Sequence, residues 1–528
     1  MASTNYLGKR YMMHAGFINN SITRSENGGI IDESWIRDTT VDAREIDVYL
    51  RDASNTIKKQ TVFLNQTYRI PFTFLEKIKN RTQKGDSLAV TDMVPTDMAA
   101  PDTDLDTDIT TAFIGHSSEY SVFRKTYTDK ITDEAGREFY GDRFYINPTT
   151  SMDSLRVMRF DNKAFIRLQP WKDDAIVSKL DVGIGDKLVN YFSFRPVDYI
   201  QGSNNVVQNS VYLYAGANGK YRKYMTWDAS GKYNFLGYEI NDFAIDANMM
   251  FNVYPFRRYK DSPLSVGVHF ETSLKEPDYY QQHLYTNHFR WDNDFSKIST
   301  TRVEASLSIP KWQTYASFGY GLLSNNIYYG TDGMVRQNTA PMSVMTATLN
   351  KNFRLWNFHL DHQAMVQLSS NEEVLPLPLL ALNFRYYLQL DVVKHVMQLQ
   401  IGANGTYTTK WYAPAYNPVL GVFHNQDERM YGNCPIIDAF INIQWKKASI
   451  FIKAVNVNMG WPNKTADYFT AAGYIAPQRA FKFGITWPFW VRPGKVATTG
   501  PDGSNAGSAR GGMGNNTGGN GRLQQTSF

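Results

Sequence analysis

The chain has little of several features that mark common protein classes. It holds a single cysteine, Cys434, among 528 residues, so it cannot form an internal disulfide, and a structural zinc site built on thiolates is disfavoured. No stretch approaches eighteen consecutive apolar residues, which excludes a transmembrane helix. The formal net charge is only +5, and the charges are dispersed without a basic run. We therefore expect no nucleic-acid partner.

Recognisable catalytic motifs are also missing. Gly183 and Gly185, in VGIGDK, form a GxG without a third glycine or a following helix, so they do not indicate a dinucleotide site. There is no GxSxG sequence, no Walker sequence and no paired-carboxylate motif in a known context. The sequence therefore predicts a protein that is not an enzyme and that has no cofactor.

Two groups of residues carry side chains of the metal-ligand type. Alternate aspartates in PDTDLDTDIT suggest either a weak Ca²⁺ site or a solvated acidic loop, which we favour because the EF-hand glycine and glutamate positions hold other residues. His359 and His362 stand three apart in a predicted strand, so they face opposite sides and cannot share a metal. The weak Ca²⁺ candidates are Asp102, Asp104, Asp106 and Asp108.

What the chain does have is a high aromatic content in a polar background. It contains 33 Tyr, 31 Phe and 11 Trp, which make 14% of the residues, yet its mean hydropathy is −0.42. A transmembrane β-barrel combines these properties because its interior is polar and its rims carry aromatic girdles. A large soluble β-protein is the alternative that composition leaves open.

The stretch FKFGITWPFW, at residues 481–490, illustrates the dominant pattern of the chain. Large apolar residues alternate with small or polar ones, and in a β-strand they fall on opposite faces. Such a strand has one apolar face, which we expect to contact lipid. The predicted lipid-facing residues are Phe481, Phe483, Ile485, Trp487 and Phe489.

The same alternation recurs along most of the chain. Residues 381–391 and 397–408 look like one hairpin with a turn near Lys394. Counting such segments gives roughly 16 to 20 strands of about ten residues or more, the length that one tilted crossing of a bilayer needs. The polar face is rich in Asn, Gln, Ser, Thr and Gly, as in a hydrated interior, rather than in the Lys and Glu of a soluble surface.

Loop lengths predict one plain rim and one elaborated rim. Tight turns are expected at Asn352 and at Lys446–Lys447, and long polar loops at 80–108, 125–150 and 410–435. Residues 493–528 are rich in Gly, Asn and Ser and predict a flexible C-terminal tail. The sequence thus divides into a barrel at 1–492 and this tail.

The predicted fold is an all-β, transmembrane antiparallel β-barrel with long loops on one side. Its polar face either lines a water-filled pore or packs a plugged interior through internal salt bridges, and the sequence leaves both open. The pore-lining candidates are Arg385, Asp391, Gln400, Asn404, Lys410, Asp438, Asn442, Gln444, Lys446 and Lys482.

Several motifs in order resemble a known family. They include FINNSITRSENGGIIDES at 17–34, NHFRWDNDF at 287–295, EEVLPLPLLALNFRYY at 372–387 and GANGTYTTKWYAPAYNP from Gly402. Over roughly residues 10–492 they resemble the putative porin family of Bacteroidota outer membranes. The resemblance implies an outer-membrane β-barrel in a Gram-negative bacterium. Members of that family carry a signal peptide, which MASTNYLGKRYMM does not resemble, so the first strands or a signal peptide are expected to be missing here.

Two functions from different classes follow from this interpretation. The first is a porin that passes small hydrophilic solutes passively. The second is a non-conducting structural or accessory barrel in a larger outer-membrane complex, which the long loops and the tail favour. The expected partners are the lipid bilayer and lipopolysaccharide, together with other outer-membrane or periplasmic subunits in the second case. A soluble β-rich binding or carbohydrate-active protein is a third, less favoured interpretation.

Overall fold

The computed structural model is all-β and is built from one large sheet. The structure describes residues 2–7, 10–37, 41–42, 44–71, 111–169, 175–192, 205–255, 263–461 and 468–487. Within these residues the main sheet has nineteen strands, which lies inside the range that the sequence predicts. The predicted tail at 493–528 lies outside the described residues.

The nineteen strands form an antiparallel meander in which consecutive main strands are hydrogen-bonded to each other, from β1 at one end to β27 at the other. They are β1 (Ala2–Leu7), β2 (Tyr11–Glu26), β3 (Ala53–Pro71), β4 (Thr111–Lys130), β5 (Thr150–Gln169), β6 (Lys179–Phe192), β7 (Asn205–Tyr221), β8 (Met225–Gly237), β9 (Phe243–Val253), β10 (Leu264–Lys275), β13 (Ile298–Ile309), β14 (Thr314–Ser324), β17 (Met342–Leu355), β18 (Phe358–Ser369), β19 (Leu380–Val393), β20 (Met397–Thr408), β23 (Ile436–Trp445), β24 (Ala448–Val455) and β27 (Ala480–Thr486).

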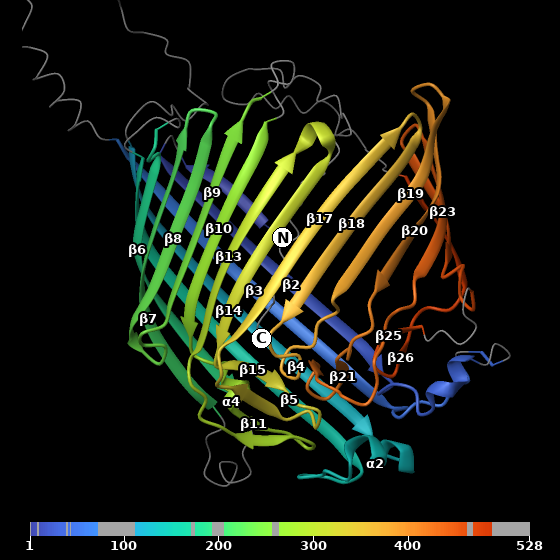
Figure 1. Cartoon of the computed structure of the whole chain (residues 1–528). Helices are drawn as coiled ribbons and strands as arrows, with labels where there is room; N and C mark the ends of the chain where they lie inside the picture. Colours follow the sequence, from blue (N-terminus) through green and yellow to red (C-terminus); the bar gives the residue numbers. More distant parts are fainter. Residues whose placement is uncertain are drawn as a thin grey trace, which may run out of the picture.

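The sheet curls round on itself (Figure 1). Strands β2 to β5 form a wall behind β13 to β18, and the strands are strongly tilted. In the described part of the chain, β1 pairs with β2 and β27 pairs with β24, and no ladder joins β1 to β27. The predicted antiparallel all-β fold is therefore confirmed, whereas a hydrogen-bonded closure is not seen among these residues.

Helices are few and short. They are η1 (Glu33–Arg37), α2 (Glu134–Tyr140), α4 (Tyr279–Gln282) and η2 (Pro310–Trp312). None of the helices in the described residues is long and apolar enough to cross a membrane. Helix α2 begins at Asp133, whose carboxylate accepts the backbone N–H of Gly136, and ends at Gly141 in the left-handed conformation, the usual signals for a short helix.

The two rims of the sheet differ, as predicted. One rim carries tight turns, such as those at 356–357, 394–396 and 446–447. The other carries long folded connections that contain small two-stranded ribbons. These ribbons are β11 (His283–Tyr285) with β12 (Arg290–Asp292), β15 (Asn326–Tyr329) with β16 (Val335–Asn338), β21 (Ala415–Asn417) with β22 (Val422–His424), and β25 (Phe469–Ala471) with β26 (Tyr474–Ile475).

Two loop predictions need correction. Asn352 lies inside β17, because the strand continues to Leu355 and the turn comes at Trp356, whose φ is +55°. Strand β4 continues to Lys130, so the predicted loop at 125–150 is a connection of residues 131–149 that holds α2. The predicted loop at 80–108 lies outside the described residues.

The largest hydrophobic core lies at the elaborated rim, where α2, α4, β11, β15 and β21 gather in Figure 1. We call it the rim core. It joins side chains from segments far apart in the sequence, because a loop can exclude water only by packing against other loops and strand ends. Its buried members are Leu50, Ala53, Tyr127, Ile131, Tyr140, Leu284, Phe289, Trp291, Val335 and Val419.

Candidate functional site: the polar face of the sheet

The strand register shows that polar residues of neighbouring strands share one face. Arg385 of β19 lies opposite Asn404 of β20, which in turn lies opposite Asp438 of β23. Because side chains alternate along each strand, every second residue from these positions falls on the same face. The candidates that the register places on this face are Arg385, Asp391, Gln400, Asn404, Asp438, Asn442, Gln444 and Lys482.

Two of the ten pore-lining candidates lie outside the strands. Lys446 follows the last residue of β23 and has a φ of +52°, so it forms the turn to β24 at the plain rim. Lys410 follows the end of β20 and lies on the elaborated rim. Strand alternation therefore cannot place either side chain on a face, because the backbone has already left the sheet.

The polar face carries hydrogen bonds and ion pairs but is not packed shut. Lys453 Nζ lies 2.7 Å from an Asp438 carboxylate oxygen, and Asn404 donates to that carboxylate at 3.5 Å. The Arg385 guanidinium lies 4.8 Å from the centre of the Tyr387 ring. None of the ten candidates is buried, and Arg385, Asp391 and Lys482 are exposed. The described strands therefore leave this face accessible to water.

The polar face is the concave one. Lys125 of β4 lies on it and donates to the backbone carbonyl of Val419 at 2.6 Å, which ties β4 to a loop 294 residues away. Asn55 of β3 likewise donates to the carbonyl of Pro418 at 2.7 Å. Loops from across the chain can meet these strands only on the side toward which the sheet curls. The elaborated-rim connections thus cover one end of the interior.

The opposite face carries apolar side chains. Phe481 and Phe483 of β27 are 77% and 78% exposed, and Ile485 is 64% exposed. In the register these three stand beside Ala454, Ile452 and Ile450 of β24, so the apolar face is continuous between the two strands. Trp487, just beyond β27, is 60% exposed, and Phe489 lies outside the described residues. Large exposed apolar side chains recur on the same face across the sheet.

The two histidines of β18 lie on opposite faces, as predicted. His359 stacks on Tyr387 with ring centres 4.6 Å apart, on the polar face. His362 interacts with the Tyr386 hydroxyl at 2.8 Å, on the apolar face. They form no joint site.

A cluster of metal-ligating residues appears where the sequence did not predict one. Asp246, His269 and Glu271 place one ligand atom each within 4.8 Å of one another, the one such group found in the described residues. The aspartates of PDTDLDTDIT lie outside those residues. The signal was available, because pairing 237–254 with 264–273 as a hairpin brings the polar positions of both strands together.

Solved structures show what the fold is similar to. The ferric-catecholate import receptor Fiu from K12 E. coli, in its closed form, matches at a TM-score of 0.53 and 9% identity, over 92% of this chain and 73% of that chain. A mutant of the ferric enterobactin receptor PfeA from Pseudomonas aeruginosa matches at 0.49 and 10% identity, over 91% and 71%. The siderophore receptor PirA from Acinetobacter baumannii matches at 0.48 and 8% identity, over 91% and 71%. At such identities the likeness shows the fold alone.

The fold and the two contrasting faces of the sheet define a large β-protein of the outer-membrane type. A family model described as a putative porin matches residues 1–490, and the chain belongs to that family. No curated protein matches the chain.

Proposed function

We propose that the sheet closes into an outer-membrane barrel through which small hydrophilic solutes diffuse passively, without catalysis. The observation that carries this proposal is the accessible polar face, on which none of the eight candidate residues that lie in strands is buried. Membership of the putative porin family supports it. The apolar face would contact the bilayer, and the rim aromatics and polar loops would meet lipopolysaccharide.

The length of the strands indicates that only part of each long strand lies within the membrane. Strand β4 has 20 residues, which at about 3.3 Å per residue is about 65 Å long. The hydrocarbon core of a bilayer is about 30 Å thick. Even with a tilt of about 45°, such a strand extends well beyond the lipid. The strand ends that hold the rim core therefore project from the membrane.

The test is single-channel conductance of the detergent-purified full chain in a planar bilayer. We expect stable, stepwise openings. Replacing Arg385 by Gln removes a positive charge from the polar face, so selectivity should shift toward cations because the electrostatic barrier to them falls. Lys482→Gln should act in the same direction. The matched control is Lys447→Gln, which removes a positive charge at the exposed turn after β23 and should leave selectivity unchanged.

A second candidate function rests on the folded rim. The connections at the elaborated rim are packed around a core and cover one end of the interior, as expected of a barrel that serves as a structural or accessory subunit. A stably inserted but silent wild-type protein would exclude the diffusion proposal and favour this one. Co-purification of defined outer-membrane or periplasmic subunits in stoichiometric amounts would then be the next measurement.

A further inference from the structure

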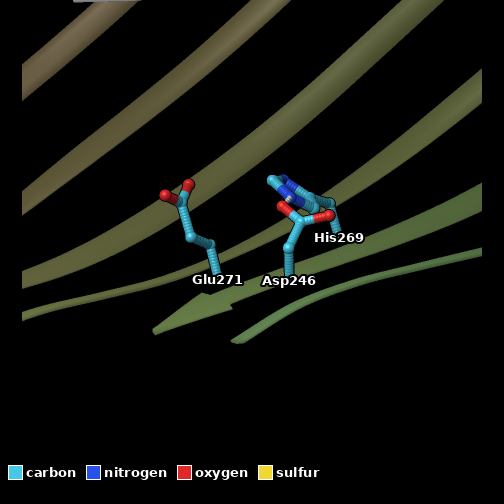
Figure 2. Close-up of side chains that lie close together, drawn as sticks. All are labelled: Asp246, His269 and Glu271. Carbon is cyan, nitrogen blue, oxygen red and sulfur yellow. Dashed lines mark hydrogen bonds and ion pairs between the residues drawn. The ribbon is translucent and has the colours of Figure 1, made fainter. Parts of the chain in front are cut away.

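Three ligand-type side chains meet on the polar face of strands β9 and β10. His269 and Glu271 stand two apart in β10, so both point to the same face. Asp246 of β9 lies directly opposite Glu271 in the register. Figure 2 shows the three side chains rising from the same side of the ribbon, with Asp246 against the imidazole of His269. All three ligand atoms lie within 4.8 Å of one another.

The hydrogen bonds leave one carboxylate available. His269 Nε2 lies 2.8 Å from Asp246 Oδ2, and Asn248 donates to Asp246 Oδ1 at 2.9 Å. Glu271, which is half-buried, forms no hydrogen bond or ion pair with any other described residue. Its neighbour in the register on β13, Arg302, is ion-paired with Glu304 instead. Glu271 is thus a carboxylate without a partner beside an Asp–His pair.

The surrounding charge favours a cation. Asn248 also donates to Asp228 of β8 at 3.0 Å, which brings a third carboxylate next to Asp246. The one guanidinium nearby, that of Arg302, is already neutralised by Glu304. The carboxylates of Asp228, Asp246 and Glu271 thus lie beside the imidazole of His269 on this part of the wall. A bound divalent cation would offset this excess of negative charge.

The donor set indicates the class of ion. An imidazole nitrogen with two carboxylate oxygens suits divalent transition metals such as Zn²⁺, whereas Ca²⁺ and Mg²⁺ prefer oxygen ligands alone. Tetrahedral zinc with bonds of about 2.0–2.2 Å holds its ligand atoms roughly 3.3 Å apart. Asp246 and His269 are already closer than this, and rotation of the flexible Glu271 side chain covers the remaining distance.

We propose that Asp246, His269 and Glu271 form a binding site for one divalent transition-metal ion on the concave wall of the sheet. Each residue contributes one ligand atom, and water completes the coordination because all three side chains are only half-buried. In the metal-free protein Nε2 of His269 donates to the Asp246 carboxylate, so a metal bound at Nε2 displaces that proton and leaves the imidazole protonated on Nδ1. The site is independent of whether the protein conducts.

The test is Zn²⁺ binding to the detergent-purified full chain by isothermal titration calorimetry, with metal removed beforehand by chelation. We expect one saturable site. His269→Gln and Glu271→Gln should each weaken binding at least about tenfold, the loss typical for a removed or disturbed ligand. The matched control is His359→Gln, which removes the polar-face histidine that stacks on Tyr387 and should leave the affinity unchanged.

The proposal is overturned if the wild-type protein shows no saturable site, or if Glu271→Gln binds as tightly as the wild type. In the latter case the group is an ordinary Asp–His pair with an idle carboxylate. Far-UV circular dichroism on each variant confirms that the sheet is intact. Because binding is measured directly, a silent channel would exclude passive diffusion without affecting this result.

Discussion

At the scale of single residues, glycines and aromatic rings on neighbouring strands fit against each other on the polar face. A Cβ atom added to Gly183 would lie 2.4 Å from the Tyr214 ring and 2.4 Å from the backbone carbonyl oxygen of Ala164. A Cβ on Gly185 would lie 2.2 Å from the Tyr212 ring. Gly183 and Gly185 of the VGIGDK stretch thus leave room for two tyrosine rings of the neighbouring strand.

We predict that Gly183→Ala destabilises the sheet by about 1–3 kcal/mol, the usual cost of forcing extra atoms into a packed site. A ring can rotate, but the carbonyl of Ala164 belongs to the β5 backbone and cannot move alone. Unfolding is followed by the change in mobility on a gel between the folded and the unfolded protein. The quantity measured is the urea concentration at the midpoint of this change.

Gly319→Ala is the matched control for this substitution. Gly319 lies in β14 on the same face, and the nearest atoms to an added Cβ are 3.9 Å away. Alanine there should be neutral or should stabilise the fold by a few tenths of a kcal/mol, up to about 1 kcal/mol, because it restricts the unfolded chain. Equal effects of the two substitutions would contradict the packing argument.

At the scale of elements, the loop between β11 and β12 is held by His288. Its Nδ1 lies 2.9 Å from the carbonyl oxygen of Arg143 and its Nε2 lies 2.6 Å from the Ser151 hydroxyl. A carbonyl can only accept, so Nδ1 carries the proton and Nε2 accepts from Ser151. Tyr140 stacks on the ring at 3.7 Å. Burial, with a smaller contribution from the Arg143 guanidinium, lowers the pKa of His288 to about 4 against the opposing effect of the hydrogen bond to the Arg143 carbonyl.

We predict that His288 makes the loop between β11 and β12 less stable as the pH falls from about 6.5 toward 4. In this window the unfolded loop binds a proton and the folded loop does not, so each step down in pH favours unfolding. Above about pH 6.5 both states are neutral and the effect vanishes. Hydrogen exchange of the peptide covering 283–292, corrected for the intrinsic exchange rate, measures it.

His288→Gln tests whether the histidine causes this pH dependence. The glutamine side chain keeps a donor and an acceptor but does not titrate, so the protection at pH 4 relative to that at pH 6.5 should be higher in the variant than in the wild type. The neighbouring carboxylate of Asp153, which accepts the backbone N–H of Asn287 at 2.9 Å, remains in the variant. Burial raises the pKa of Asp153 to about 6, so this carboxyl group favours the folded loop as the pH falls and cannot cause the loss of stability. An unchanged pH dependence of protection would therefore contradict a role for His288.

At the scale of the whole molecule, the assignment of faces makes a direct prediction. In a Cys434→Ser background, Gln400→Cys should react with a hydrophilic maleimide in liposomes, because Gln400 lies on the accessible polar face. Ile401→Cys, one residue further along β20, should react at least about tenfold more slowly, because its side chain points to the lipid side. Equal labelling of both positions would contradict a lipid-facing apolar side.

Much of this architecture could be predicted from the sequence, because alternation is a local signal. The hairpin of β19 and β20 follows directly from the period of two and a turn near Lys394. The error at Asn352 arose because polar residues near a strand end look like a turn when only their immediate neighbours are considered. Strand ends are set by pairing with the next strand, which the local pattern does not contain.

The rim core could not be predicted, because it depends on contacts between distant segments. Asn55 and Pro418 are 363 residues apart, and nothing in either local sequence indicates that they meet. The Asp246–His269–Glu271 group is intermediate in how well the sequence could predict it. Its members lie in strands that the sequence did predict, but their meeting requires the hairpin register as well as the faces.

The odd number of strands in the main sheet affects how the sheet could close. Each of the eighteen steps from β1 to β27 reverses the chain direction, so the first and last of the nineteen strands run the same way. A direct seam between them would be a parallel ladder, whereas every other ladder of the main sheet is antiparallel. Parallel hydrogen bonds are slanted and slightly weaker per residue. A barrel closed in this way would separate first at the ladder between β1 and β27 when pulled apart. An additional strand could pair with the two strand edges exposed there.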